Sequence, residues 1–127
     1  MDFKKNTRPI YLQIADMICD AVLAGTYVPG GRVPSVREYA ASVAVNPNTV
    51  MRTYEHLTQR GVIANRRGVG YFVTEDAPEL IRGLRQESFV GGELPEVFHR
   101  LRLLGMTPEQ LARLYGEYLA ASEQPPG

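Results

Sequence analysis

The fold is decided by residues 35–50, SVREYAASVAVNPNTV, and by the glycine-rich segment NRRGVG at residues 65–70. Ser35 stands three residues before Glu38, which is the spacing of a capping box at a helix start. Asn46 followed by Pro47 marks a second helix start, because asparagine is a good N-cap and proline fits the first helical position. These signals predict two helices joined by a short turn.

The flanking segments add a first helix and a β-hairpin. Apolar residues recur at helical spacing over residues 10–24, and Gly25 is expected to end that helix. The next two helices are expected to cover about 36–43 and 47–59. Apolar runs at 62–64 and 71–73 flank the glycine-rich tip, which is typical of a hairpin. The sequence therefore predicts a winged helix-turn-helix.

Beyond Thr74 the pattern is helical. One stretch is expected from Pro78 to about residue 104, and its continuity through Gly91-Gly92 is left open. Thr107 is expected to cap a last helix. The predicted fold class is α+β, mainly α. We expect a winged helix-turn-helix in residues 1–75, a small helical dimerisation region in residues 76–121 and a disordered tail in residues 122–127.

Charge is unevenly distributed in a chain whose net charge is zero. Residues 31–70 contain six arginines against two glutamates, a balance of +4, whereas residues 77–127 contain five arginines against seven glutamates, a balance of −2. A basic module of this kind is the electrostatic footprint of nucleic-acid binding. The sequence thus predicts a basic reading module followed by a slightly acidic tail.

Cysteine content and hydropathy indicate the cellular compartment in which the protein is expected. The single Cys19 cannot form an intramolecular disulfide, and it is expected to be a buried thiol rather than a redox sensor. No apolar run approaches the ~20 residues that a membrane span needs, and the basic N-terminus has no apolar core behind it. We therefore expect a cytoplasmic, bacterial-type protein without membrane attachment.

The predicted helix-turn-helix suggests which residues would meet DNA. The second helix of this motif enters the major groove with its N-terminal turns against the base edges, and the start of the preceding helix favours phosphate. Glycines in the wing would let the backbone approach closely. The candidate DNA-contacting residues are Ser35, Arg37, Asn46, Pro47, Asn48, Thr49, Arg52, Arg66, Arg67, Gly68 and Gly70. For Ser35 and Asn46, a purely capping role stays open.

The tail is too short to bury its own apolar faces. Packing against the same surface of a second chain would bury them, although packing on its own winged helix is the alternative. The candidate dimerisation residues are Leu80, Leu84, Leu94, Val97, Phe98, Leu101, Leu104, Leu111, Leu114 and Tyr118.

Metal, cofactor and catalytic sites are not expected. His56 and His99 lack ligand-like spacing, and no nucleophile–base pair can be recognised. Gly68 and Gly70 precede a strand instead of opening a helix, so a nucleotide-binding loop is excluded by context.

Four ordered blocks resemble the N-terminal domain of GntR-type transcriptional regulators, namely PIYLQI (9–14), GGRVPSVRE (30–38), VNPNTV (45–50) and RGVGYFV (67–73). The resemblance implies that Arg37, residues 46–49, Arg52 and residues 66–70 face an operator. Some members carry an arginine where Pro47 stands, so that contact is absent. The short helical tail is most similar to the YtrA-type branch, in which it is a dimerisation unit.

The resemblance implies a homodimeric, sequence-specific repressor that acts on palindromic double-stranded DNA and is not an enzyme. Larger branches of the family carry an effector domain of a hundred or more residues, so a deep metabolite pocket is not expected here, and a small-molecule effector stays open. Two alternatives remain, which are a winged helix used for protein interaction and a sensor with its ligand between tail helices of the dimer.

Overall fold

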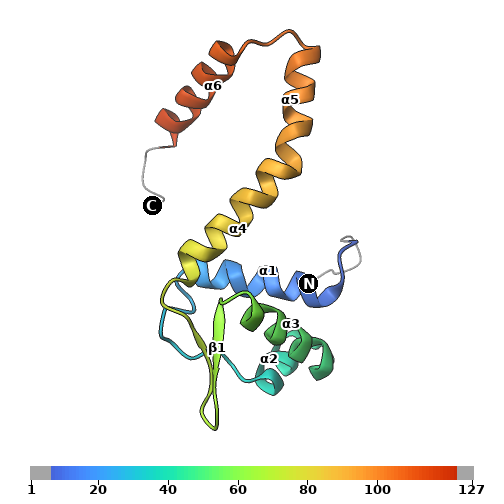
Figure 1. Cartoon of the computed structure of the whole chain (residues 1–127), viewed down its shortest axis with the longest axis vertical. Coiled ribbons are helices and arrows are strands. Elements are labelled where there is room, and N and C mark those ends of the chain that lie inside the picture. Colours follow the sequence, from blue (N-terminus) through green and yellow to red (C-terminus); the bar gives the residue numbers. More distant parts are fainter. Residues whose placement is uncertain (1–6, 123–127) are drawn as a thin grey trace. The chain divides into compact units, whose positions relative to one another are not determined.

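A computed structural model describes residues 7–122, and the chain divides into two units at Arg85. The first unit has the predicted winged helix-turn-helix architecture, α+β but mainly α (Figure 1). Its elements are α1 (Ile10–Leu23), α2 (Val36–Val43), α3 (Pro47–Gln59), β1 (Ile63–Arg66), β2 (Gly70–Val73) and the beginning of α4 (Ala77–Gly91).

The helix boundaries follow from local chemistry. The Ser35 hydroxyl accepts the Glu38 backbone N–H at 3.1 Å, and the Glu38 carboxylate accepts the Ser35 N–H at 3.1 Å, so the predicted capping box is confirmed. At α3, the Asn46 side chain accepts the Asn48 N–H at 2.8 Å, and Pro47 is the first helical residue. Gly25 has a φ of +82°, the left-handed conformation that ends α1.

The core of the first unit lies where the three helices meet the hairpin. Large side chains that are at most 2 % exposed come from α1, α3 and both strands, namely Ile14, Ile18, Val50, Tyr54, Leu57, Ile63 and Val73. Burying each such side chain contributes roughly 1.5–3 kcal/mol. Tyr54 also satisfies its polar end, because its hydroxyl donates to the Pro34 carbonyl at 2.7 Å.

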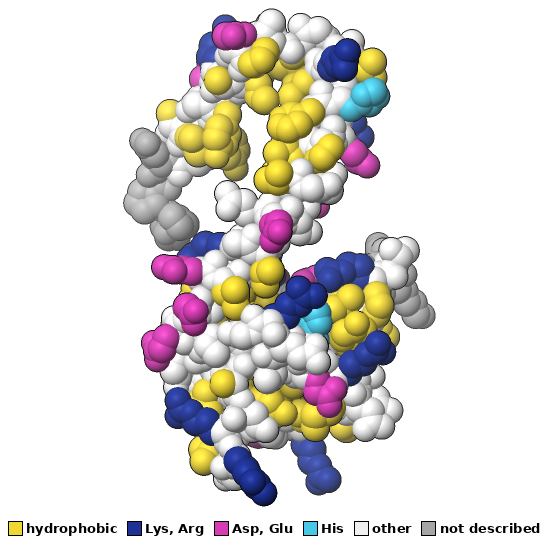
Figure 2. Space-filling view, viewed as in Figure 1, with side chains coloured by type: hydrophobic (Ala, Val, Ile, Leu, Met, Phe, Trp, Pro, Cys, Tyr) yellow, Lys and Arg dark blue, Asp and Glu magenta, His cyan; other side chains and the backbone are white. Residues whose placement is uncertain are grey.

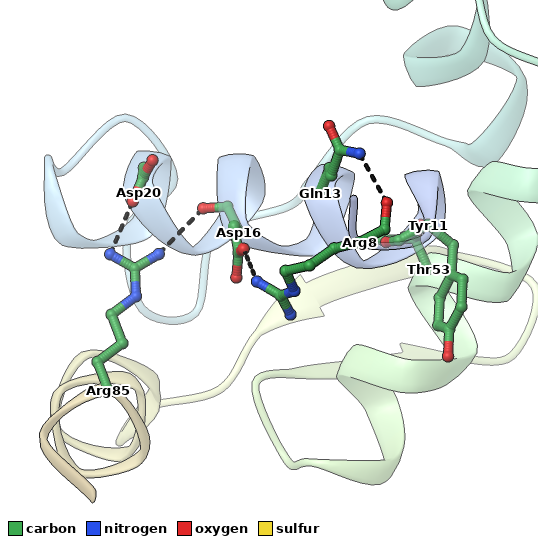
Figure 3. Close-up of polar contacts among 7 residues, drawn as sticks. All are labelled: Arg8, Tyr11, Gln13, Asp16, Asp20, Thr53 and Arg85. Carbon is green, nitrogen blue, oxygen red and sulfur yellow. Dashed lines mark hydrogen bonds and ion pairs between the residues drawn. The ribbon is translucent and has the colours of Figure 1, made fainter. Parts of the chain in front are cut away.

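A buried threonine ties α3 to α1. Thr53 is 0 % exposed, and its hydroxyl donates to the Tyr11 carbonyl at 2.8 Å (Figure 3). The Thr49 carbonyl is a second acceptor at 3.2 Å. Because a buried hydroxyl without a partner is costly, this bond favours one placement of α3 on α1.

The wing is an antiparallel hairpin in which Ile63 pairs with Val73 and Arg66 with Gly70. A third segment joins its base, since Arg32 forms an isolated bridge with Phe72. The hairpin thus has one edge covered by the segment that precedes α2.

The first unit extends to Arg85, ten residues beyond the boundary expected from the sequence. The reason is that Ala77 and Ile81 of α4 are buried in the winged-helix core, at 0 % and 2 % exposure. Leu80, which the sequence pattern assigns to the dimer face, packs against this same core. Arg85 then anchors α4 to α1 through an ion pair with Asp20 at 2.7 Å (Figure 3).

The second unit contains the end of α4, α5 (Glu93–Leu103) and α6 (Pro108–Ala121). The helical stretch expected from 78 to 104 is not continuous. It is broken at Gly92, which is the N-cap of α5. The predicted Thr107 cap is confirmed, with a reciprocal bond to Gln110. Of the expected tail, Ser122 is the C-cap of α6, and residues 123–127 lie outside the described residues.

None of the helices in the described part of the chain combines the length and apolarity that a membrane crossing requires.

Candidate nucleic-acid interface

The recognition helix α3 has a sharply divided surface. Val50, Tyr54 and Leu57 point into the core, whereas Asn48 and Arg52 are exposed to solvent. The exposed residues lie in the first two turns, which is the part of a helix-turn-helix that meets base edges. The expected readers are therefore available on the surface of α3, apart from Thr49, which is half-buried.

Two of the candidate contacts act as caps in this structure. The side-chain oxygens of Ser35 and Asn46 each accept a backbone N–H of the helix that they begin. Hydrogen bonds from the Ser35 backbone and then from its side chain hold the pKa of the Glu38 carboxyl below its ordinary value. Arg37, two residues after Ser35, and Pro47, which follows Asn46, are exposed.

Arg52 is held by an aromatic ring from another helix. Its guanidinium carbon lies 4.1 Å from the centroid of the Tyr11 ring on α1. The His56 ring also lies beside the Tyr11 ring, with a centroid distance of 5.9 Å in an edge-to-face arrangement. Burial, and then the charges of Arg60 and Arg8, lower the pKa of His56. A lowered pKa favours the neutral form of the His56 imidazole, beside the ring that carries the Arg52 guanidinium.

The wing presents the second basic group. Arg66 lies over the Phe72 ring at 4.1 Å, and Arg67 and Gly68 form the exposed turn. Gly68 has a φ of +77° and no atom within 4 Å of the position that a Cβ would take, so the backbone of the tip is open to a close approach. Figure 2 shows dark-blue side chains gathered at the wing end of the first unit.

Two residues of this surface were not predicted from the sequence. Arg32 lies beside β2, a placement that depends on pairing with Phe72 forty positions away and has no local signal. Met51 is 41 % exposed on α3, on the turn that also carries Asn48. An apolar residue on a solvent-facing helix surface is the only sequence signal that could have indicated it.

The described residues contain no group of three or more His, Cys, Asp or Glu side chains that could hold a metal ion. The acidic pair on α1 is engaged by arginines, Asp16 with Arg8 and Asp20 with Arg85. Cys19 packs against the core, and burial raises its pKa to about 11, which disfavours the reactive thiolate.

Comparison with known proteins identifies the same architecture elsewhere. The family model "Bacterial regulatory proteins, gntR family" matches residues 10–73. The HTH-type transcriptional regulator YhcF of Bacillus subtilis is 39% identical over 108 residues, which are 84% of this chain and 87% of that protein. The HTH-type transcriptional repressor YtrA of the same organism is 40% identical over 73 residues, 58% of this chain and 56% of that protein.

A crystal structure from Bacteroides thetaiotaomicron, described as a transcriptional regulator of the GntR family, shares the fold with a TM-score of 0.80 and 46% identity. The match covers 91% of this chain and 100% of that chain, so it includes the helical region as well as the winged helix. The chain therefore belongs to the GntR family of bacterial regulatory proteins, in its YtrA-like subfamily, and is a DNA-binding transcriptional regulator and not an enzyme.

Proposed function

We propose that the protein acts as a homodimer that binds a palindromic operator in the cytoplasm and represses transcription there. The observation that carries this proposal is the exposed apolar surface of the second unit. Its exposed large apolar residues are Phe89, Val90, Val97, Phe98, Leu103, Leu104, Leu114, Tyr115, Tyr118 and Leu119. In Figure 2 yellow side chains are widely visible on α5 and α6.

Such a surface favours association. Within α5 and α6, which are described in full, no side chain is buried. Exposed apolar patches of this kind mark interaction sites, and a two-fold interface between identical chains would bury both copies at once. The residues proposed for the interface are Leu84, Leu94, Val97, Phe98, Leu101, Leu104, Leu111, Leu114 and Tyr118.

A dimer of this kind fits the way in which a helix-turn-helix reads DNA. Each winged helix carries one recognition helix, so two copies would read two half-sites, and the symmetry of the operator would mirror that of the protein. We propose that Arg37, Asn48, Thr49 and Arg52 contact one half-site. The wing residues Arg66, Arg67, Gly68 and Gly70 would contact the flanking backbone and minor groove, while Ser35, Asn46 and Pro47 would contribute mainly through their helix N-termini.

Repression would follow from occlusion of the promoter, and the name of the related YtrA of Bacillus subtilis supports this direction of regulation. The test is a titration of DNA upstream of the protein's own gene at two salt concentrations, together with sedimentation equilibrium. We expect salt-dependent, sequence-preferring binding by a dimer. A protein that binds no DNA would favour the protein-interaction alternative, and a protein that binds as a monomer would exclude the dimer.

A further inference from the structure

The segment before α2 belongs to the wing. The Gly30 N–H donates to the Val73 carbonyl at 2.8 Å, the Val73 N–H donates to the Gly31 carbonyl at 2.9 Å, and the Val33 N–H donates to the Tyr71 carbonyl at 3.0 Å. These bonds place Arg32 directly opposite Phe72, in an isolated antiparallel bridge along the free edge of β2.

The pleat of the sheet brings two arginines onto one face. Cross-strand partners and residues two positions apart share a face of a sheet. Arg32 pairs with Phe72, and Arg66 pairs with Gly70, which is two residues from Phe72. Arg32, Phe72, Gly70 and Arg66 therefore share one face. The opposite face carries the buried Ile63 and Val73, so the arginine face is the outer one.

Both guanidinium groups are held in place. Arg66 rests on the Phe72 ring at 4.1 Å. Arg32 lies against Gly70, because a Cβ at position 70 would come within 3.1 Å of the Arg32 Nε and 3.6 Å of its Nη2. Side chains that are ordered before binding lose less entropy when a ligand binds.

Glu38, whose carboxyl feels the charge of Arg32, is already engaged elsewhere. The Glu38 carboxylate accepts the Ser35 N–H in the capping box, and the charge of Arg32 lowers the pKa of that carboxyl less than the Ser35 hydrogen bonds do. With the described residues, Arg32 forms no ion pair within 4.0 Å. Its charge thus remains available to an anion from outside.

We propose that Arg32 and Arg66 form a clamp for DNA backbone phosphates on the outer face of the wing, and that Gly70 is the gap in which Arg32 is seated. This inference rests on the proposed function and adds Arg32 and the role of Gly70 to it. Guanidinium groups present paired N–H donors that match phosphate oxygens, and contacts to phosphate position a protein without reading sequence. The ligand is the sugar–phosphate backbone of duplex DNA.

The first test is a titration of operator and of unrelated duplex DNA at several salt concentrations. Arg32→Ala and Arg66→Ala should each weaken binding to both DNAs by a similar factor and reduce the slope of log K against log salt by about 0.9. Arg32→Lys should retain most of the slope. Arg82→Ala, which removes an exposed arginine from α4, is the matched control and should change neither quantity.

The outcomes separate this inference from the function on which it rests. If the wild-type protein binds its operator and Arg32→Ala matches it in affinity and slope, the clamp is overturned while the operator function stands. A loss confined to one operator base would also overturn it, since that is base reading. A wild-type protein without salt-dependent DNA binding would overturn both.

The seat at Gly70 needs a double-mutant cycle, because Gly70→Ala also strains a backbone with a φ of +135°. That strain is present whether residue 32 is arginine or alanine. If Gly70 seats Arg32, Gly70→Ala should cost clearly less operator affinity in the Arg32→Ala background than in the wild type. Equal costs in the two backgrounds would refute the seating role, and thermal melting of each variant would confirm that it is folded.

Discussion

The guanidinium carbon of Arg52 lies 4.1 Å from the centroid of the Tyr11 ring, so a side chain from α1 orients an arginine on the exposed face of the recognition helix. A cation over an aromatic face is stabilised by about 0.5–1 kcal/mol at an exposed site. If Arg52 reads DNA as proposed, the first turn of α1 would contribute to the reading surface although it lies outside the helix-turn-helix itself.

Arg52→Ala should weaken operator binding by about 1–3 kcal/mol and relax specificity at one base pair, because arginine pairs bidentately with guanine in the major groove. The measurement is a titration of operator variants substituted at each position. Gln59→Ala, an exposed change at the far end of the same helix, is the control. A uniform loss on all variants would assign Arg52 to the backbone instead.

Tyr11→Ala should weaken operator binding about two- to fivefold, since Arg52 would lose the ring that orients it. Tyr11→Phe keeps the ring and should bind almost as the wild type does. Neither change removes the hydrogen bond from Thr53, because that bond is accepted by the Tyr11 backbone carbonyl. Equal binding by the alanine and phenylalanine variants would show that the ring does not position Arg52.

Ala44→Gly should stabilise the protein by about 0.5–1 kcal/mol. Ala44 ends α2 with φ 55° and ψ 47°, a left-handed conformation that costs a residue with a Cβ roughly 1–2 kcal/mol and glycine little. Glycine loses part of this gain through the larger entropy of its unfolded chain. Urea unfolding measures the change, and Ala41→Gly within α2 should have the opposite sign, a loss of about 1 kcal/mol.

Local signals predicted the helix boundaries well, whereas long-range contacts could not be read from the sequence. The caps at Ser35 and Asn46 act over two or three residues, so the sequence specifies them directly. Arg32 meets its partner only through strand pairing, which no local pattern encodes. Helical periodicity shows that Leu80 lies on an apolar face, but it does not show whether that face meets the chain's own core or a second copy.

Stability should fall more steeply above pH 9 in the wild type than in Cys19→Ala. Burial raises the pKa of Cys19 to about 11 from an ordinary 9.0, so the folded state keeps its thiol proton where the unfolded state has lost it. The stabilisation from the neutral thiol is therefore complete below pH 9 and is lost as the pH rises toward 11. Urea unfolding between pH 7 and 11 measures this, and parallel curves for the two proteins would contradict it.

Phe98→Glu should convert the proposed dimer to a monomer at micromolar concentration. Phe98 is 50 % exposed on α5, and burial of an aromatic side chain in an interface contributes about 2 kcal/mol or more, a change of over tenfold in the dissociation constant. A glutamate there would also have to be desolvated on association. Sedimentation equilibrium measures the dimer dissociation constant. In an operator titration, the variant should bind the palindrome more weakly than the wild type does, whereas its affinity for a single half-site should change less.

The matched control is His99→Glu, which introduces the same charge at the next position of the same helix, outside the proposed interface. It should leave the dimer constant within a few-fold of the wild type. Because both positions are exposed in the single chain, neither substitution disturbs a buried contact, and both variants should melt like the wild type. If the Phe98→Glu protein stays dimeric, Phe98 does not lie in the dimer interface. Titration of that variant with the palindromic operator would then show whether its dimer binds DNA.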